Sequence, residues 1–397
     1  MGEATKTTLG DLAKAGHLEF GDGYRTKRAE HGKPGIPILR VAEVLDGKIL
    51  PALEDYVSDA YRDSMGQKIS QPGDVVLTTK GTVGRVAIMP SNSPEFVYSP
   101  QLCYFRLRPG SPLLARYLYY WFKSEQFWSQ ARSRKSQTDM ADYLNLADIR
   151  SLEISLPELR EQQAVTSVLG ALDDKIAVNE RIARSCDELR ALRFVDFIQS
   201  SPSKVIERPL SSFADFVNGR AFTKNATGTG RMVIRIAEIN SGPGGSTVYN
   251  DIDVPDRHLA RPGDVLFAWS GSLTVARWFR PEAIVNQHIF KVIPRDGLPN
   301  WLLFELIRTK LKKFQSIAAD KATTMGHIQR RHLDEPVSAP ADDVVSRLDS
   351  QLGPLWERAL TAEQESLTLA ALRDTLLPKL ISGELRVRDA EKAVEEA

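Results

Sequence analysis

The sequence of 397 residues contains little cysteine and no long apolar run. Its only cysteines are Cys103 and Cys186, which excludes a disulfide framework and a four-cysteine metal site. No apolar stretch approaches the roughly 18 residues of a bilayer-spanning helix, and the first residues lack the pattern of a secretory leader. With 42% hydrophobic and 26% charged residues, we expect a globular cytoplasmic protein of two to four domains.

The sequence also lacks the motifs of common catalytic sites. It has no G-x-x-x-x-G-K-[ST] phosphate loop and no H-E-x-x-H zinc pair, and its six histidines have no metal-ligand spacing. Asp74 and Lys80 faintly resemble a nuclease carboxylate–lysine pair, but where Asp264 repeats the aspartate, Ser270 replaces the lysine. The sequence therefore predicts no catalytic residue and no metal site.

Charge is unevenly distributed along the chain. Lys and Arg outnumber Asp and Glu 20 to 18 in residues 1–157 and 19 to 13 in residues 201–340. Acidic residues prevail 8 to 6 in residues 158–200 and 12 to 7 in residues 341–397. A protein that neutralises phosphates needs a basic surface, so the first and third segments are the candidates for nucleic-acid binding.

The chain contains an internal repeat. Four blocks recur in the same order: 38–44 with 233–239, 72–82 with 262–272, 95–101 with 282–288, and 138–144 with 324–328. The offset between the copies drifts slowly from 195 at Arg40 and Arg235 to 183 at Pro157 and Pro340. This indicates a tandem duplication, in which residues 1–157 (the first globule) and 201–340 (the second globule) share one fold and Asp74 is equivalent to Asp264.

Each repeat unit has a mixed α+β part and a long helix. Short β-type runs at 75–79, 83–88, 265–269 and 289–293 are punctuated by glycine turns, and a helix is predicted at 113–132 and at 301–319. The aromatic row between Tyr117 and Trp128 is interpreted as core packing rather than base stacking.

The segments 158–200 and 341–397 carry heptad patterns. Apolar residues at alternating steps of three and four include Leu172, Ile176 and Leu189 in the first segment and Leu352 and Leu355 in the second. Each stripe is too narrow to be a core by itself, so we predict that the two helices pack antiparallel as a coiled-coil spacer between the globules. The expected fold is thus α+β, with two globules separated by two long helices and related by a pseudo-two-fold repeat.

Two candidate surfaces for nucleic acid stand out in each copy. The first is the glycine turn after the Pro-Gly-Asp strand, where hydroxyls, backbone N–H groups and cations suit phosphates or base edges, although a solvated hairpin turn is an equal alternative. Its candidate residues are Lys80, Gly81, Thr82 and Arg85, and then Ser270, Gly271, Ser272 and Arg277. The second surface follows the helix of each globule, where a basic helix end is the alternative interpretation. Its candidate residues are Arg132, Arg134, Lys135, Gln137, Lys313, Lys321 and Thr323.

Several motifs resemble one known family. Leu156-Pro-Glu-Leu-Arg-Glu-Gln-Gln-Ala-Val165, followed by Leu169-Gly-Ala-Leu-Asp-Asp-Lys-Ile176, resembles the pattern that opens the central conserved region of type I restriction–modification specificity subunits. The tail from Leu372 to Leu385 resembles the C-terminal helix ending of the family, and the Arg-x-x-Glu and Pro-Gly-Asp-Val blocks resemble its target-recognition domains. One departure is Asp342-Asp343 in place of the Glu-Gln pair in the second copy.

The resemblance implies a DNA-binding function. Each globule would be a target-recognition domain for one half of a split, asymmetric DNA sequence, and the helices would set the gap and bind two modification subunits. Those partners would supply S-adenosylmethionine and adenine methylation, and restriction subunits would add ATP, magnesium and cleavage, so this chain itself needs no cofactor. The alternatives are a methyltransferase or nuclease with an unrecognised site, and a coiled-coil scaffold that binds only proteins.

Overall fold

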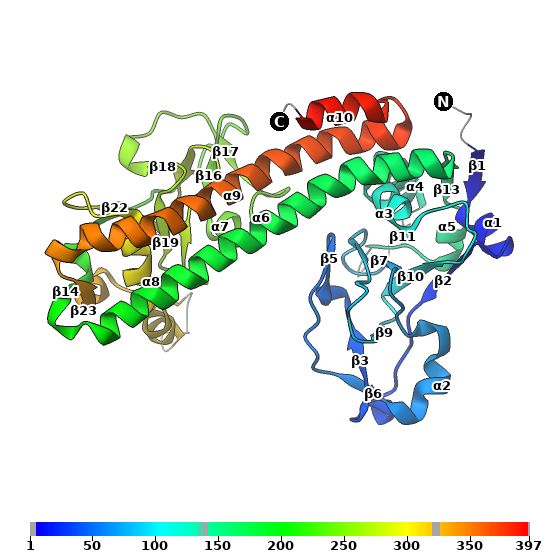
Figure 1. Cartoon of the computed structure of the whole chain (residues 1–397), viewed down its shortest axis with the longest axis horizontal. Helices are drawn as coiled ribbons and strands as arrows, with labels where there is room; N and C mark the ends of the chain where they lie inside the picture. The colour runs from blue at the N-terminus through cyan, green and yellow to red at the C-terminus, as the bar shows by residue number, and fades with distance from the viewer. Residues whose placement is uncertain (1–4, 135, 138–141, 320–325, 396–397) are drawn as a thin grey trace. The chain divides into compact units, whose positions relative to one another are not determined.

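The computed structural model describes every residue except 1–4, 135, 138–141, 320–325 and 396–397. It divides into two compact units (Figure 1). Unit 1 comprises residues 1–173 and 371–397, and unit 2 comprises residues 174–370. The boundaries fall within two long helices, so each unit contains one globule and a part of both helices. Within the described residues, no helix is long and apolar enough to span a membrane.

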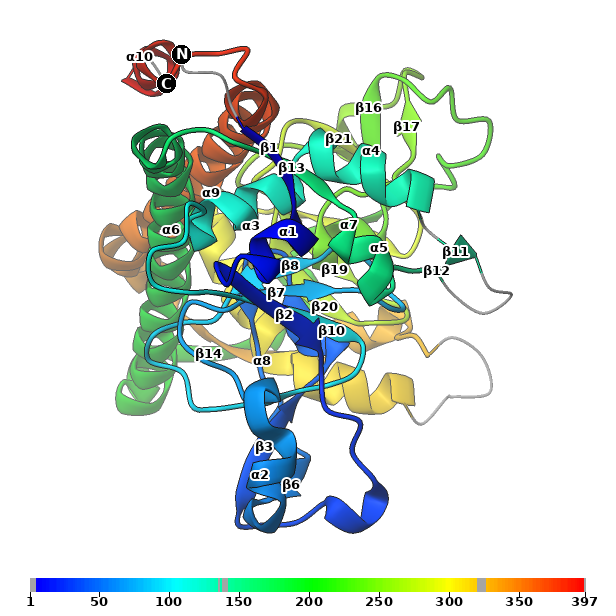
Figure 2. The same cartoon turned by 90° about the vertical axis from the view of Figure 1, so that its right-hand side faces the viewer.

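The first globule is built on an antiparallel sheet of four strands in the order β2-β10-β7-β8 (Figure 2). These strands are β2 (Leu18–Asp22), β10 (Leu102–Leu107), β7 (Val75–Thr78) and β8 (Val86–Ile88). A second sheet has the order β6-β3-β9, with bounds Tyr56–Ser58, Gly35–Leu39 and Val97–Tyr98. A two-stranded pair joins β1 (Thr5–Thr8) to β13 (Glu153–Leu156). All four side chains of β7 are buried, as its Val-Val-Leu-Thr sequence permits.

The remaining elements of the first globule are short. Helices α1, α2 and α5 span Leu9–Lys14, Arg62–Met65 and Leu146–Arg150, and the hairpin of β4 and β5 spans Val44–Leu45 and Lys48–Ile49. The helix predicted at 113–132 is two helices, α3 (Ala115–Lys123) and α4 (Glu125–Arg134). Buried Ser124 separates them in an extended conformation, and its hydroxyl donates a hydrogen bond to the carbonyl oxygen of Trp121 at 2.7 Å. The aromatic row lies mainly in α3, and all its members except half-buried Trp128 are buried, which confirms its core role.

The second globule repeats this strand order. Its antiparallel sheet runs β15-β22-β19-β20, with bounds Ala214–Asn218, Ile289–Pro294, Val265–Ala268 and Thr274–Arg277. Its other sheet runs β17-β16-β21-β18, with bounds Tyr249–Asn250, Arg231–Ile234, Ala283–Val285 and Leu259–Ala260. The parallel pairing of β16 with β21 matches that of β3 with β9. The pair of β14 (Val205–Pro209) and β23 (Pro336–Pro340) matches that of β1 and β13. The helices are α7 (Ile236–Ser241) and α8 (Asn300–Ala319).

Equivalent hydrogen bonds at the Pro-Gly-Asp blocks confirm the predicted duplication. The Asp74 carboxylate accepts a hydrogen bond from the backbone nitrogen of Gln71 at 2.8 Å, immediately before β7. The Asp264 carboxylate accepts one from the backbone nitrogen of Arg261, also at 2.8 Å, immediately before β19. The two aspartates therefore occupy the same place in the fold.

The Arg-x-x-Glu blocks are structural elements. The backbone nitrogen of Arg40 donates to the carboxylate of Glu43 at 2.6 Å, and that of Arg235 donates to Glu238 at 2.9 Å. Both glutamates are buried at the start of a helical turn, where a carboxylate caps free backbone N–H groups. The repeated motif thus specifies a helix start, with Glu238 held ionised because the hydrogen bonds from Arg235 outweigh burial and lower its pKa.

The two long helices are α6 (Leu159–Ser200) and α9 (Asp342–Ser382), and a short helix, α10 (Val387–Glu395), follows α9 (Figure 1). Helices α6 and α9 pack together antiparallel. In unit 1, Asp173 of α6 pairs with Arg373 of α9, and in unit 2, Asn179 of α6 donates a hydrogen bond to Glu365 of α9 at 2.9 Å. Leu172 and Leu352 are buried, as the heptad pattern predicts.

One position of the heptad prediction is wrong. Leu189 is 42% exposed, whereas its neighbour Arg190 is fully buried. The buried stripe of α6 passes through Ala183, Arg190 and Phe194, because the second globule supplies Glu305 as an ionic partner for the arginine. Tertiary contacts therefore override the hydrophobic pattern at this point.

Candidate nucleic-acid interface

The turn between β7 and β8 is anchored at its base and exposed at its tip. Thr79 donates hydrogen bonds from its backbone nitrogen (2.9 Å) and its Oγ1 (3.0 Å) to the carbonyl oxygen of Gln101. Gly81 has a φ of 79°, a left-handed conformation that favours glycine. Gly81 and Thr82 are exposed, whereas Lys80 and Arg85 are half-buried. The turn therefore presents glycine, hydroxyl and cationic groups from a fixed base.

A short hairpin from later in the chain lies against this turn. Its strands are β11 (Ser136–Gln137) and β12 (Asp142–Tyr143). Lys80 forms an antiparallel bridge with Tyr143, and the backbone nitrogen of Leu144 donates to the carbonyl oxygen of Thr79 at 3.0 Å. The two surfaces that the sequence suggested separately thus adjoin. We call residues 79–85, 136–137 and 142–144 platform 1.

The second globule has the same arrangement. Ser270 forms an antiparallel bridge with His327, and the backbone nitrogen of Ile328 donates to the carbonyl oxygen of Trp269 at 3.1 Å. The backbone nitrogen of Gly271 also donates to the carbonyl oxygen of Gly326 at 2.9 Å. Gly271 and Ser272 are exposed at the tip, while Ser270 is only 3% exposed. We call residues 269–274 and 326–328 platform 2.

The two platforms carry different side chains at matching positions. Because they make the same backbone contacts, the matching pairs are Thr79 and Trp269, Gln101 and His288, and Tyr143 and His327. The Trp269 ring centre lies 5.2 Å from that of His288 and 6.2 Å from that of His327, and its Nε1 donates to Asn218 Oδ1 at 2.8 Å. No sequence motif marks this aromatic group, although the register of the repeat makes Trp269, His288 and His327 equivalent to Thr79, Gln101 and Tyr143.

The structure corrects the placement of Arg277. This arginine ends β20, is only 6% exposed, and points its guanidinium at the long helices. Its Nε lies 2.8 Å from a carboxylate oxygen of Glu363 in α9, and its Nη1 lies 3.0 Å from one of Asp187 in α6. A guanidinium held by two carboxylates is not available to a phosphate. The spacing from Gly271 suggested a turn residue, but the strand carries Arg277 away from platform 2.

Three other predicted cations have partners outside the platforms. Exposed Arg132 pairs with Glu125, and Arg134 Nε donates to the hydroxyl of Ser151 at 2.9 Å. Lys313 Nζ lies 2.6 Å from a carboxylate oxygen of Glu335. Gln137 is placed by the backbone pairing of β11 with β12. The remaining candidates lie outside the described residues; they are Lys135, Lys321 and Thr323.

Comparison with known proteins reveals the family of this duplicated fold. Residues 1–185 match the family described as "Type I restriction modification DNA specificity domain". The MjaIX type I restriction enzyme specificity subunit of Methanocaldococcus jannaschii is 22% identical over 358 residues, which cover 81% of this chain and 80% of that protein. These matches support a type I restriction–modification specificity subunit.

Other members of the family are similar over shorter stretches or in fold. The putative MjaX specificity subunit of the same organism is 26% identical over 165 residues, covering 40% of this chain and 38% of that protein. The crystal structure of the type I restriction–modification S subunit from M. genitalium has a TM-score of 0.57 at 14% identity, with 95% of each chain covered. The fold of this S subunit thus extends over nearly the whole chain, and the match to a DNA specificity domain covers residues 1–185.

The aspartate that resembled a nuclease residue has a structural role in the first globule. Asp74 is 1% exposed, and its carboxylate accepts hydrogen bonds from Arg106 Nε and from the Tyr98 hydroxyl, both at 2.8 Å. Burial and the neighbouring Asp74 carboxylate raise the pKa of Tyr98, so the phenol stays protonated. Across the part of the chain that the structure describes, no group of three or more His, Cys, Asp or Glu residues could hold a metal ion.

Proposed function

We propose that this chain is the non-catalytic, sequence-reading subunit of a type I restriction–modification complex. Platform 1 would read one half of a split, asymmetric DNA target and platform 2 the other half, while α6 and α9 would set the gap between them. The observation that carries this proposal is the pair of platforms, which share one backbone arrangement but differ at Thr79 and Trp269. A duplicated frame with different side chains suits the reading of two different half-sites.

Binding against salt concentration tests this proposal. A randomised duplex pool first yields the target of the wild-type chain, and each half is then scrambled in turn. Replacing Lys80 and Arg85 together with alanine removes two phosphate contacts, so we expect the salt slope to fall by about 1.8, at roughly 0.9 for each contact on duplex DNA. The loss should concern only the half-site of the first globule.

A matched control uses cations outside both platforms. Lys14 in α1 and Arg388 in α10 are exposed, and their double alanine variant should keep the wild-type slope. If the Lys80 and Arg85 variant also keeps its slope and affinity, platform 1 does not contact DNA through these cations. A wild-type chain that enriches no sequence from the pool contradicts the proposed function as a whole.

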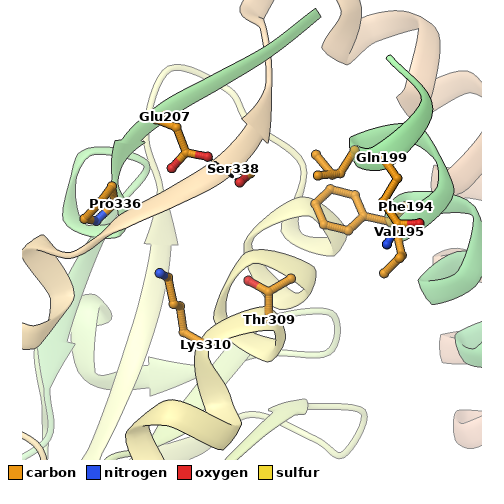
Figure 3. A pocket seen from close by; sticks show the side chains of 9 residues that line it. Phe194, Val195, Gln199, Glu207, Thr309, Lys310, Pro336 and Ser338 are labelled. Carbon is orange, nitrogen blue, oxygen red and sulfur yellow. Dashed lines mark hydrogen bonds between the residues drawn. The ribbon is translucent and has the colours of Figure 1, made fainter. Parts of the chain in front are cut away.

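The proposal includes two modification subunits that bind the long helices. Seven large apolar side chains are exposed among the described residues, and five of them lie on α6: Leu159, Val178, Leu189, Leu192 and Val195. Leu189, Leu192 and Val195 follow one another at helical steps of three, so they form a stripe, and Val195 also lines a pocket of about 300 Å³ with Phe194 (Figure 3). Exposed apolar stripes of this kind mark protein-binding surfaces.

A substitution in this stripe tests the partner. Leu192 is 69% exposed, so Leu192→Glu should leave the fold and DNA binding intact while it removes co-purification of the modification subunit. The same change at Leu50, which is 59% exposed outside the long helices, is the control and should retain the partner. Undiminished co-purification with Leu192→Glu would place the partner elsewhere. We further propose that S-adenosylmethionine and methylation belong to these partners, and ATP, magnesium and cleavage to restriction subunits.

A further inference from the structure

Two arginines occupy equivalent places in the long helices. The offset of 183 that relates Pro157 to Pro340 also relates Arg190 in α6 to Arg373 in α9. The same offset relates Asp173 to Trp356. In unit 1, Asp173 and Arg373 lie together, and Asp173 contacts α3, which covers the sheet of the first globule. In unit 2, Arg190 and Trp356 lie together, and Arg190 contacts α8, which covers the sheet of the second globule.

The first cluster lies in unit 1 and consists of Tyr120, Asp173 and Arg373, which we call hub 1. The Tyr120 hydroxyl of α3 donates to Asp173 Oδ2 at 2.7 Å, and Arg373 Nη1 donates to Asp173 Oδ1 at 2.8 Å. Asp173 is thus shared between the globule and α9. Tyr120 is fully buried, and Asp173 and Arg373 are 22% and 17% exposed at their side chains.

The second cluster lies in unit 2 and consists of Arg190, Glu305 and Trp356, which we call hub 2. Arg190 Nε donates to a carboxylate oxygen of Glu305 in α8 at 3.0 Å, and the guanidinium carbon lies 4.9 Å from the Trp356 ring centre. Arg277 lies on the same ring at 4.5 Å, which adds a strand of the globule to the cluster. Arg190 and Glu305 are 0% and 1% exposed.

Both hubs tie one globule to both long helices through directional contacts. An apolar interface tolerates sliding, whereas a shared carboxylate and a guanidinium stacked on an indole accept a narrow range of angles. Hub 1 joins α3, α6 and α9 at Asp173, and hub 2 joins α8, α6 and α9 at Arg190. The geometry therefore fixes the orientation of each globule on its helices at one point.

We infer that hubs 1 and 2 determine which gap between the half-sites this protein accepts, with Arg373 and Arg190 as positioning residues that do not contact DNA. This inference rests on the proposed function, in which each globule reads one half-site. When two binding modules are joined rigidly, the effective concentration of the second module is high at one spacing and falls steeply at others. If a globule can change its orientation on the helices, the protein should bind the native gap with less preference and accept altered gaps more readily.

The test measures binding to a series of duplexes that differ only in the gap. The half-sites come from the selection with the wild-type chain, and the gap is changed by one and two base pairs in each direction. For Arg373→Met and Arg190→Lys we expect the preference for the native gap to fall by about fivefold or more. Lysine keeps the charge of Arg190 but lacks the planar fork that bonds Glu305 and stacks on Trp356.

Two further measurements separate positioning from general loss of structure. Affinity for duplexes with one half scrambled reports each globule alone and should stay at the wild-type value. Tyr120→Phe removes one hydroxyl from hub 1 and should broaden the gap preference without loss of folding. Arg193→Met is the matched control, because this arginine of α6 is exposed and lies outside both hubs.

An unchanged ratio between native and altered gaps in folded hub variants overturns the inference. A loss of half-site affinity that equals the loss on the full target also overturns it, because the arginines would then only support the globule. If the wild-type chain selects no split sequence, the proposed function is wrong. If it selects one but the hub variants keep the wild-type gap preference, only the inference about the hubs is wrong.

Discussion

The two globules share a strand order but are held to the long helices by different chemistry. Hub 1 uses a tyrosine hydroxyl, a partly exposed aspartate and an arginine at its edge. Hub 2 has a fully buried arginine at the position that matches Arg373 and an indole at the position that matches Asp173, and a glutamate of α8 pairs with the arginine. Both hubs contain an arginine at the equivalent position, but Arg373 pairs with Asp173, whereas Arg190 pairs with Glu305 and stacks on Trp356. The duplicated backbone thus retains the position of a contact while its polarity and burial diverge.

The platforms show the same separation of frame and chemistry. The backbone bonds of Thr79 and Trp269 match, yet one side chain is a small hydroxyl and the other a large indole. Hydrogen bonds of the backbone preserve the frame irrespective of the side chain, so the side chains at these two positions are free to differ.

The largest expected effect comes from charges placed in the buried contact between α6 and α9 in each unit. Leu172→Asp in unit 1 and Leu352→Asp in unit 2 each place a charge where the leucine is 2% or 1% exposed. We expect each to lower the free energy of unfolding by about 5 kcal/mol, because burial of the leucine is lost and an unpaired charge is buried. Urea unfolding measures both. Leu192→Asp at an exposed position is the control and should change little; a stable Leu172→Asp variant would contradict the packing in unit 1 alone.

The next effect separates the two hubs. Arg190→Met removes the buried partner of Glu305 and leaves it the partly exposed Arg308, and breaking a buried pair in this way costs about 3–5 kcal/mol. Arg373→Met should cost about 1 kcal/mol, since water reaches Asp173 and Tyr120 still donates to it. Equal losses in urea unfolding would show that the difference in burial between the hubs has no energetic consequence.

A smaller effect is expected for Tyr120→Phe. The variant keeps the buried ring but removes the hydroxyl that donates to Asp173, so the free energy of unfolding should fall by about 1 kcal/mol. Tyr117→Phe is a matched control on the same helix, because its hydroxyl makes only a long contact of 3.4 Å to a backbone oxygen. A larger loss of unfolding free energy for Tyr117→Phe than for Tyr120→Phe would show that the hydrogen bond from Tyr120 to Asp173 does not stabilise hub 1.

The smallest expected effect is a difference in pH dependence. Burial raises the pKa values of Glu305 and Glu363 in unit 2 above their ordinary value of 4.5. Between pH 4.5 and the raised pKa values, these two carboxylates bind protons more readily in the folded state than in the unfolded state. At neutral pH the two buried charges therefore lower the free energy of unfolding, and this loss is recovered as the pH falls through that range. The wild type should gain stability relative to Glu363→Gln on acidification from pH 7.

The corresponding measurement for hub 1 should show no such trend. Burial raises the pKa of Tyr120 above its ordinary value of 10, so the hydroxyl does not titrate between pH 5 and pH 8. The difference in unfolding free energy between the wild type and Tyr120→Phe should then be flat over this range. A flat difference for Glu363→Gln as well would contradict burial of the Glu363 carboxylate, which pairs with Arg277 beside hub 2.

Much of the architecture follows from patterns within the sequence. The repeated blocks make Asp74 equivalent to Asp264, and the heptad patterns predict α6 and α9. Both signals can be predicted because they depend on local propensity and periodicity. The expectation of one helix at 113–132 failed at Ser124, where a hydrogen bond to Trp121 and burial in the core favour a break that no local signal marks.

By itself the sequence determined the duplication, the two long helices and the glycine turns, since each arises from residues close together in the chain. Only the tertiary structure decided that Arg190 rather than Leu189 is buried, that Arg277 faces carboxylates, and that the turn at Gly81 pairs with a strand about sixty residues later. The physical reason is that a buried charge is stable only beside its partners, and those partners come from elements far apart in the sequence.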